Sequence, residues 1–214
     1  MAEKNKRITK TVVGLLAIAA LITGLFVSQH LHQSHQIDIS QFNGTVLEKP
    51  RTVAAFSLQG IDGQIFDNQQ LQGQWTLVFF GFTNCGYLCP TTMAELAKTY
   101  KLLEQQKVAK LPKVVMISID PPRDNLEKLK SYVTAFNPNF YAARGDNKDI
   151  RKMTREFGIA YAKVAAPAGK NPEDYDVQHS GTVMLFNPQG QLCAFFTTPQ
   201  QADLLAKDYA LLVK

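Results

Sequence analysis

An apolar segment that runs directly into two closely spaced cysteines constrains the fold of this chain most. Residues 75–83, WTLVFFGFT, are too uniformly apolar for a half-exposed strand and are typical of a buried central strand in a parallel sheet. Cys85 and Cys89 follow at once, and Pro90 suits the first turn of a helix, where its missing N–H is not needed. Residues 91–106 then repeat apolar side chains at helical spacing. We therefore predict that both cysteines lie at a strand-to-helix junction.

The rest of the chain alternates between strand and helix patterns. The predicted elements are a hairpin within 54–66 that turns at 60–63, a strand at 113–120, a helix at 126–136, a strand at 140–144, a helix at 149–157, a short extended stretch at 161–164, a loop at 165–176, two strands around a turn at 187–190 and a helix at 201–213. This order is that of the thioredoxin fold with an N-terminal β-hairpin extension. We expect one α/β domain of this kind over residues 53–214.

The N-terminus carries most of the formal net charge of +5. Four basic residues and one acidic residue give the first ten residues a charge of +3, which leaves +2 for the others (5 − 3). A nucleic-acid-binding domain gathers its basic residues on one folded face. This distribution therefore predicts no nucleic-acid partner.

An uncharged and mostly apolar run over residues 11–28 follows the basic cluster. Its eighteen residues reach the lower limit for a helix that spans a bilayer. Because no small-residue cleavage pattern follows it, we expect an uncleaved single transmembrane helix, with a cleaved signal peptide as the alternative. The positive-inside rule makes residues 1–10 cytoplasmic and exports the folded domain.

The polar segment 29–52 is predicted to be a tether between the apolar run and the domain. It holds three of the four histidines, which are His30, His32 and His35. Gln and Ser flank these histidines, so we interpret them as part of a solvated linker rather than as a metal site.

The spacing and position of Cys85 and Cys89 indicate a chemically reactive pair and not a structural disulfide. A disulfide between residues four apart would close too small a loop to stabilise a domain of this size. The positive end of a helix stabilises a thiolate at this place and lowers its pKa. Thiol–disulfide exchange and metal binding both remain open from these residues alone.

His179 is the only histidine within the predicted domain. It follows the acidic loop 165–176 and precedes a buried strand that should lie beside the central strand. Thiol oxidoreductases of this fold place a cis-proline in that position, but this chain has no proline between Pro172 and Pro188. Two thiolates and one imidazole form a donor set that copper accepts, and His179 is the candidate third donor.

Three segments carry a resemblance to the Sco/SenC family of copper-binding proteins. They are FFGFTNCGYLCP, VMISIDPPRDNLEKL and QHSGTVMLFNPQGQL, and the resemblance extends from about residue 53 to residue 200. It implies a thioredoxin-like domain anchored in the inner membrane by a single span and exposed on the periplasmic side. It also implies one Cu(I) or Cu(II) ion per chain, bound by Cys85, Cys89 and His179.

The function that the resemblance implies is copper delivery to the binuclear copper centre of cytochrome c oxidase. The implied partners are the copper-receiving subunit of the oxidase and other copper carriers, and the chain would be a carrier rather than an enzyme. The alternative is a thiol–disulfide reductase that keeps the oxidase's copper-site cysteines reduced.

The chain departs from the family pattern at several positions. Gly86 and Tyr87 stand where family members commonly have a proline and an acid, and Gln178 stands where an aspartate often precedes the histidine. If that acid orients the imidazole, copper affinity or redox preference should differ here. Cys193 is not a family ligand, and its place in a predicted strand indicates a small buried hydrophobic residue.

Overall fold

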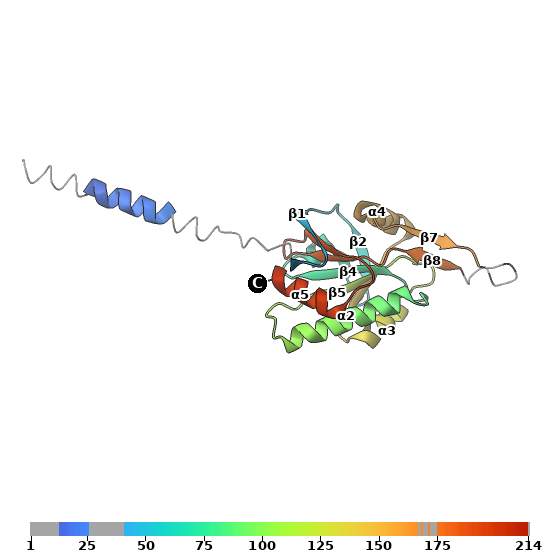
Figure 1. Cartoon of the computed structure of the whole chain (residues 1–214). Helices are drawn as coiled ribbons and strands as arrows, with labels where there is room; N and C mark the ends of the chain where they lie inside the picture. The colour runs from blue at the N-terminus through green and yellow to red at the C-terminus, as the bar shows by residue number, and fades with distance from the viewer. Residues whose placement is uncertain (1–12, 26–40, 167, 169–170, 172–174, 214) are drawn as a thin grey trace, which may run out of the picture. The chain divides into compact units, whose positions relative to one another are not determined.

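The computed structural model describes residues 13–25, 41–166, 168, 171 and 175–213 (Figure 1). Backbone contacts divide the chain into two units, Met1–Asp38 and Ile39–Lys214.

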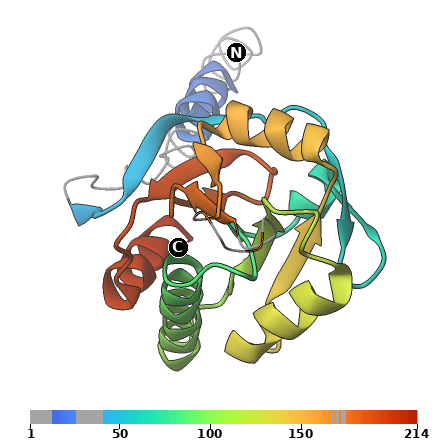
Figure 2. The same cartoon turned by 90° about the vertical axis from the view of Figure 1, so that its right-hand side faces the viewer.

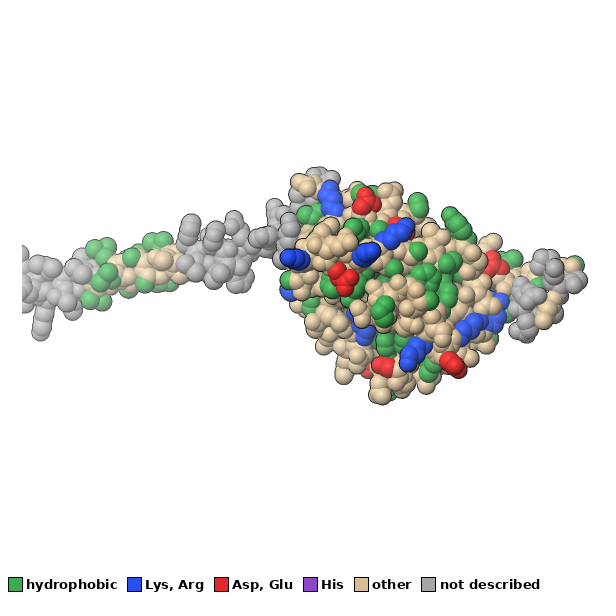
Figure 3. All heavy atoms as spheres, turned by 90° about the horizontal axis from the view of Figure 1, so that it is seen from below, with side chains coloured by type: hydrophobic (Ala, Val, Ile, Leu, Met, Phe, Trp, Pro, Cys, Tyr) green, Lys and Arg blue, Asp and Glu red, His purple; other side chains and the backbone are tan. Residues whose placement is uncertain are grey.

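In the first unit, residues 13–25 form a helix whose side chains are all exposed, many of them apolar (Figure 3). Within the described ranges, no helix combines the length and the apolar character needed to cross a membrane. The predicted span 11–28 continues past this helix at both ends, into residues that are not described. The three tether histidines also lie outside the described residues.

The second unit is built on a sheet whose central strands carry uniformly buried side chains. In β4 (Thr76–Gly81) every side chain is buried, as the sequence predicted for the segment before Cys85. β4 lies between β5 (Lys113–Ser118), which is parallel to it, and β9 (Val183–Phe186), which is antiparallel. The eight strands follow the order β1 (Thr45–Arg51), β10 (Leu192–Phe196), β9, β4, β5, β6 (Tyr141–Arg144), β2 (Ser57–Gly60) and β3 (Ile65–Asp67).

Helices cover both faces of this sheet. α2 (Leu88–Gln105), α3 (Leu126–Phe136) and α5 (Ala202–Leu212) pack on one face, and α4 (Asn147–Phe157) packs on the other (Figures 1 and 2). A short 3₁₀ helix, Asn68–Leu71, follows β3. The arrangement is the predicted thioredoxin-like α/β fold, and β2 and β3 form the predicted extra hairpin.

The predicted loop 165–176 ends in a strand that the sequence did not reveal. β7 (Tyr161–Val164) and β8 (Asp176–His179) pair in an antiparallel two-stranded sheet of their own. His179 is therefore the last residue of a strand and not the end of a loop. Only Val177 is buried among the four residues of β8, so the segment lacks the apolar alternation by which strands are recognised.

The folded unit also begins earlier than residue 53. β1 lies inside the segment 29–52 that the sequence predicted as a tether, and it pairs with β10 through Thr45↔Phe195 and Val46↔Ala194. β1 is an edge strand and most of its side chains are exposed, so its sequence looks like that of a polar linker.

A buried carboxylate fixes this first part of the unit to the last helix. The Asp208 side chain is fully buried in α5. Its oxygens accept the backbone N–H groups of Asn43 and Gly44 at 2.8 and 2.9 Å, and the Asn43 side-chain amide at 2.9 Å. Asp208 thus satisfies the donors that the chain presents just before β1.

We expect Asp208→Ala to lower the free energy of unfolding by about 2–3 kcal/mol, because it leaves two backbone donors without an acceptor. Urea unfolding of the full chain measures this, and Lys207→Ala, an exposed position next to it, is the matched control. The control should change the value by less than about 0.5 kcal/mol. Equal effects of the two variants would contradict the role of Asp208.

Candidate metal centre

Three side chains from separate parts of the chain meet at one end of the sheet. The ligand atoms of Cys85, Cys89 and His179 all lie within 4.8 Å of one another. Cys85 lies in the loop after β4, Cys89 in the first turn of α2, and His179 at the end of β8. The structure thus brings together the three residues that the sequence singled out.

Cys89 is the buried member of the group. Its side chain is fully enclosed, and its Sγ lies 3.3 Å from Nε2 of His179. Gly81 makes room for the sulfur at the end of β4. A Cβ at residue 81 would lie 3.1 Å from the Cys89 Sγ and 2.6 Å from a ring carbon of Phe79, so a larger residue would displace one of them.

Cys85 is the half-buried member, and its sulfur accepts a hydrogen bond from the first turn of α2. The residue before the helix, Tyr87, makes no side-chain capping hydrogen bond. Instead, the backbone N–H of Cys89 donates to the Sγ of Cys85 at 3.3 Å. A thiolate at this place satisfies a donor that the helix leaves unpaired.

The two thiols have very different pKa values because they share a hydrogen bond. The pKa of Cys85 is lowered from 9.0 to about 4, mainly by the hydrogen bond from the Cys89 thiol and further by His179 and backbone N–H groups, against the effect of burial. The same hydrogen bond and burial raise the pKa of Cys89. At neutral pH the metal-free pair therefore holds one thiolate, on Cys85, and one proton, on Cys89.

Hydrogen bonding and packing orient His179. Its Nδ1 lies 3.0 Å from the backbone oxygen of Ser180, and because a carbonyl only accepts, Nδ1 carries the proton. Nε2 then points toward the sulfur of Cys89, 3.3 Å away. The ring packs against Phe79 and Phe82, with centroid distances of 5.9 and 5.7 Å.

The imidazole is therefore oriented by a carbonyl and not by an acid. Asp176, the nearest described acid before His179 in the sequence, is exposed and accepts the N–H of Val177 at 2.8 Å. The absence of an aspartate at position 178 does not leave Nδ1 without a partner.

Two acids of the turn after β5 hold the backbone on both sides of the site. Asp124 is fully buried and accepts the hydroxyls of Thr83 and Ser118 at 2.5 and 2.7 Å. It also accepts the backbone N–H of Thr83 at 3.2 Å. Thr83 lies two residues before Cys85, so Asp124 fixes the loop that carries the half-buried sulfur.

Asp120 and Arg123 hold the hairpin that carries His179. Asp120 is fully buried and accepts the Tyr175 hydroxyl at 2.6 Å and the Arg123 Nε–H at 2.5 Å. The guanidinium of Arg123 also donates to the Tyr175 backbone oxygen at 2.7 Å and lies 3.7 Å from the centroid of its ring. Tyr175 immediately precedes β8, so these contacts tie the hairpin to the sheet.

The sequence analysis did not predict the role of Asp120, Arg123 and Tyr175. The DPPRD segment contributed to the family resemblance, but its letters do not say what its acids bind. Tyr175 carries no sequence signal of its own, because its partners lie more than fifty residues away. Asn125, which follows the DPPRD segment, acts locally: its side chain caps α3 by accepting the Lys128 N–H at 2.8 Å.

Cys193 is buried, as its strand pattern predicted, and is not one of the three residues of the candidate site. It is 7% exposed within β10, and its thiol donates to the backbone oxygen of Leu185 at 3.3 Å. Burial raises its pKa to about 12. It is a small buried hydrophobic residue with a protonated thiol.

Comparison with known proteins shows similarity over most of the chain. The family model SCO1/SenC matches residues 44–214. An SCO2-like protein of Rickettsia prowazekii is 30% identical over 212 residues, which cover 99% of this chain and 98% of that protein.

Two solved structures are similar over most of the folded unit. The crystal structure of Arabidopsis thaliana ScoI with copper bound is 28% identical with a TM-score of 0.68, and the match covers 73% of this chain and 94% of that one. The solution structure of apo Sco1 from Thermus thermophilus is 30% identical with a TM-score of 0.63, covering 80% and 94%.

The low pKa of Cys85 predicts an unusual pH dependence of thiol alkylation in the reduced, metal-free protein. A depressed pKa makes the thiolate the main form above that value, so the iodoacetamide rate at Cys85 should be nearly constant between about pH 6 and pH 8 and fall only toward pH 4. An ordinary thiol would react about tenfold faster per pH unit in that range.

Mass spectrometry of digested protein assigns the modified residue. Cys85 should be alkylated first, and Cys193 serves as the internal control that stays unmodified in the folded chain. A tenfold rise per pH unit at Cys85 would show that its pKa is not lowered.

Proposed function

The chain belongs to the SCO1/SenC family, and from that premise we propose that it binds one copper ion through Cys85, Cys89 and His179. We further propose that it delivers this copper to the binuclear centre of cytochrome c oxidase. The observation that carries the proposal is the position of His179, whose Nε2 lies 3.3 Å from the Cys89 sulfur in a group of three ligand atoms that all lie within 4.8 Å of one another. The Arabidopsis relative with bound copper supports it.

The donor set suits copper as a cargo. Thiolates are soft ligands that select Cu(I), and imidazole binds Cu(I) and Cu(II) alike. Cys89 must lose its proton before both sulfurs can bind the ion, so binding should weaken in acid. The oxygen ligands that Mg²⁺ and Ca²⁺ require are not part of this group of three side chains.

The unequal burial of the two sulfurs suggests how copper leaves. Cys89 is enclosed, whereas Cys85 is half-buried at the surface beside Tyr87, whose side chain is 78% exposed. A thiolate or imidazole of the recipient can therefore replace Cys85 first. Exchange of one ligand at a time keeps the ion coordinated throughout the transfer.

We place the protein in the inner membrane, with residues 11–28 as a single span and the folded unit on the periplasmic side. The eighteen uncharged residues and the basic cluster before them support this placement. The folded unit should stay with the membrane after an alkaline carbonate wash and be cleaved by protease added to the periplasm. Release by the wash would contradict the anchor.

A thiol–disulfide reductase is the second candidate, and the cysteine pair gives it a specific basis. A thiolate on Cys85 can attack a substrate disulfide, and the thiol of Cys89 lies close enough to resolve the mixed disulfide. The products would be a reduced substrate and a Cys85–Cys89 disulfide, which an external reductant must reduce again. This activity does not require His179.

We expect His179→Ala to weaken copper binding by the reduced full-length chain about a hundredfold or more, since even the outer partners of metal ligands contribute 10–100-fold. Titration against a competing copper chelator measures the affinity, and absorption spectroscopy should show a changed coordination. The wild-type chain should bind one copper. The matched control replaces His30, His32 and His35 with alanine and should leave both measurements unchanged.

The same variant separates the two functions. Unchanged copper affinity in His179→Ala would remove this residue from the site. Wild-type turnover of a protein disulfide by His179→Ala, combined with failure of that variant to restore oxidase activity, would establish that reductase chemistry and copper delivery are separable. Loss of oxidase assembly only in cysteine variants would favour the reductase.

A further inference from the structure

We propose that the groove between α4 and β7 binds an acidic segment of a partner protein in an extended conformation, as a strand added to the free edge of β7. This proposal does not depend on copper binding. It is based on the charge of the groove and on the backbone groups along that edge.

The groove is a surface cavity of about 590 Å³. α4 forms one wall, and the segment that enters and includes β7 forms the other, as Figure 1 shows for the two elements. Three cations line it, Arg151, Arg155 and Lys163, and no carboxylate does. The other lining residues are Asn147, Thr154, Ile159, Ala160, Tyr161 and Ala162. An anionic ligand therefore meets only attractive charge there.

The edge of β7 offers backbone hydrogen-bonding groups to a new strand. Ser180 N–H donates to Ala160 O at 3.1 Å, which makes residues 160 and 180 a hydrogen-bonded pair of the antiparallel ladder. Such pairs alternate, so the next residue that bonds to β8 is Ala162. Tyr161 and Lys163 therefore point their N–H and C=O groups away from β8, and within the described part of the chain no backbone hydrogen bond uses them.

The cations lie where the side chains of an added strand would reach. Arg151 and Arg155 are four residues apart and so share one face of α4, and both are exposed. Lys163 projects from β7 itself, with its Nζ 4.4 Å from the centroid of the Tyr175 ring. The guanidinium groups of α4 and Lys163 all line the cavity in which a strand added to β7 would lie.

This combination selects a peptide over other anions. A phosphate or a nucleic-acid backbone would satisfy the cations but would leave the alternating N–H and C=O groups of the edge without matching partners. A peptide strand pairs with those groups through its own backbone and supplies carboxylates through its side chains.

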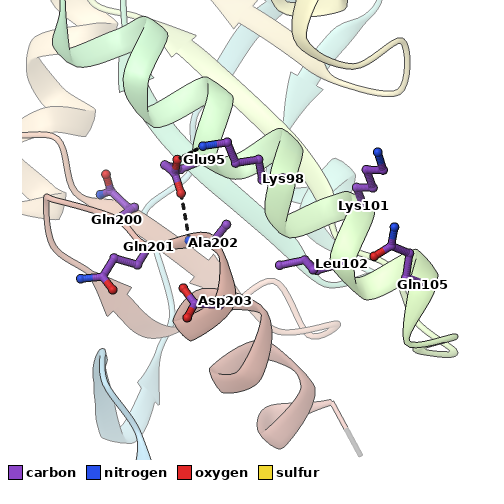
Figure 4. A pocket seen from close by; sticks show the side chains of 9 residues that line it. All are labelled: Glu95, Lys98, Lys101, Leu102, Gln105, Gln200, Gln201, Ala202 and Asp203. Atoms are coloured by element: carbon purple, nitrogen blue, oxygen red, sulfur yellow. Dashed lines mark hydrogen bonds and ion pairs between the residues drawn. The ribbon is translucent and has the colours of Figure 1, made fainter.

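A second groove that contains lysines, between α2 and α5, lacks these properties (Figure 4). Glu95 there accepts both the Lys98 ammonium at 2.6 Å and the Ala202 N–H at 3.0 Å, so the lysine and the start of α5 already have a partner. Asp203 adds a further negative charge to its lining. The α2–α5 groove therefore serves as a control surface.

The position of the groove relates it to the metal centre. Tyr161 lies directly opposite His179 in the ladder between β7 and β8. Because neighbouring strands are about 4.8 Å apart, a strand added to β7 would lie about 10 Å from β8. A partner held in this way would have the rest of its chain close to the end of the hairpin that carries His179.

The test measures binding of a fluorescent, end-capped eight-residue peptide that alternates glutamate with threonine and valine. The full-length chain is used in neutral detergent, reduced and without metal. We expect the double variant Arg151→Glu and Arg155→Glu to weaken binding at least about tenfold, because two attractive charges become repulsive. The double variant Lys98→Glu and Lys101→Glu, in the control groove, should change it by less than about twofold.

Two further peptides test the strand pairing. One peptide carries N-methyl groups on its odd-numbered residues and the other on its even-numbered residues. Each peptide therefore lacks the backbone N–H donors along one of its two edges and keeps those along the other. Strand addition requires that one methylated peptide loses binding at least about tenfold while the other binds like the parent. The amide protons of Tyr161 and Lys163 should exchange more slowly with solvent when the parent peptide is bound.

Three results would overturn the proposal. They are equal binding of the two methylated peptides, equal loss in the two charge-reversed variants, and no binding of the parent peptide at millimolar concentration. An unchanged urea unfolding midpoint of the α4 variant verifies that it is folded, so a loss of peptide binding cannot be assigned to unfolding.

Discussion

The hydrogen bond from the Cys89 N–H to the sulfur of Cys85 is the contact on which the site depends. It joins the start of α2 to the loop after β4, and it places a thiolate where the helix offers unpaired donors. The central strand β4 is buried on both sides and cannot shift. The loop after β4 and the start of α2 are therefore held in a fixed position. The position of the reactive sulfur thus follows from the sheet itself.

The buried acids of the turn after β5 fix the positions of the loop before Cys85 and of the hairpin that carries His179. Asp124 holds the backbone before Cys85, and Asp120 with Arg123 holds Tyr175 at the start of β8. Both acids lie at the end of the strand next to β4. One turn therefore fixes the thiol loop and the histidine hairpin relative to each other, although almost a hundred residues separate them in the sequence.

Much of the fold was predictable from the sequence because apolar periodicity marks its central elements. α3 was predicted with its observed bounds, and the β2–β3 hairpin and the strand before Cys85 were also correct. The errors lie at the edges of the structure. β1 and β8 bury few side chains, since one is an edge strand and the other belongs to a small separate sheet. Their pairing depends on backbone contacts that carry no residue-type signal.

The site was predictable to a different degree at each position. The cysteines follow from their place at the strand-to-helix junction, whereas His179 was assigned by its position in the fold order and by resemblance. The roles of Asp120, Arg123 and Tyr175 could not be predicted, because they consist of contacts between distant segments. Likewise, the requirement for glycine at position 81 could not be predicted, because it depends on the proximity of the Cys89 sulfur.

The direction of the β7–β8 ladder has a consequence for how this part of the chain can vary. Tyr161↔His179 lies at one end of the ladder and Val164↔Asp176 at the other, and the connecting segment joins the strands at the second end. The ladder therefore separates that connection from the imidazole by three residue pairs. Insertions, deletions and charge changes in the part of the connection before Tyr175 therefore lie away from the imidazole. Length variation in that part of the hairpin can alter the surface around the candidate site while Cys85, Cys89 and His179 keep their positions.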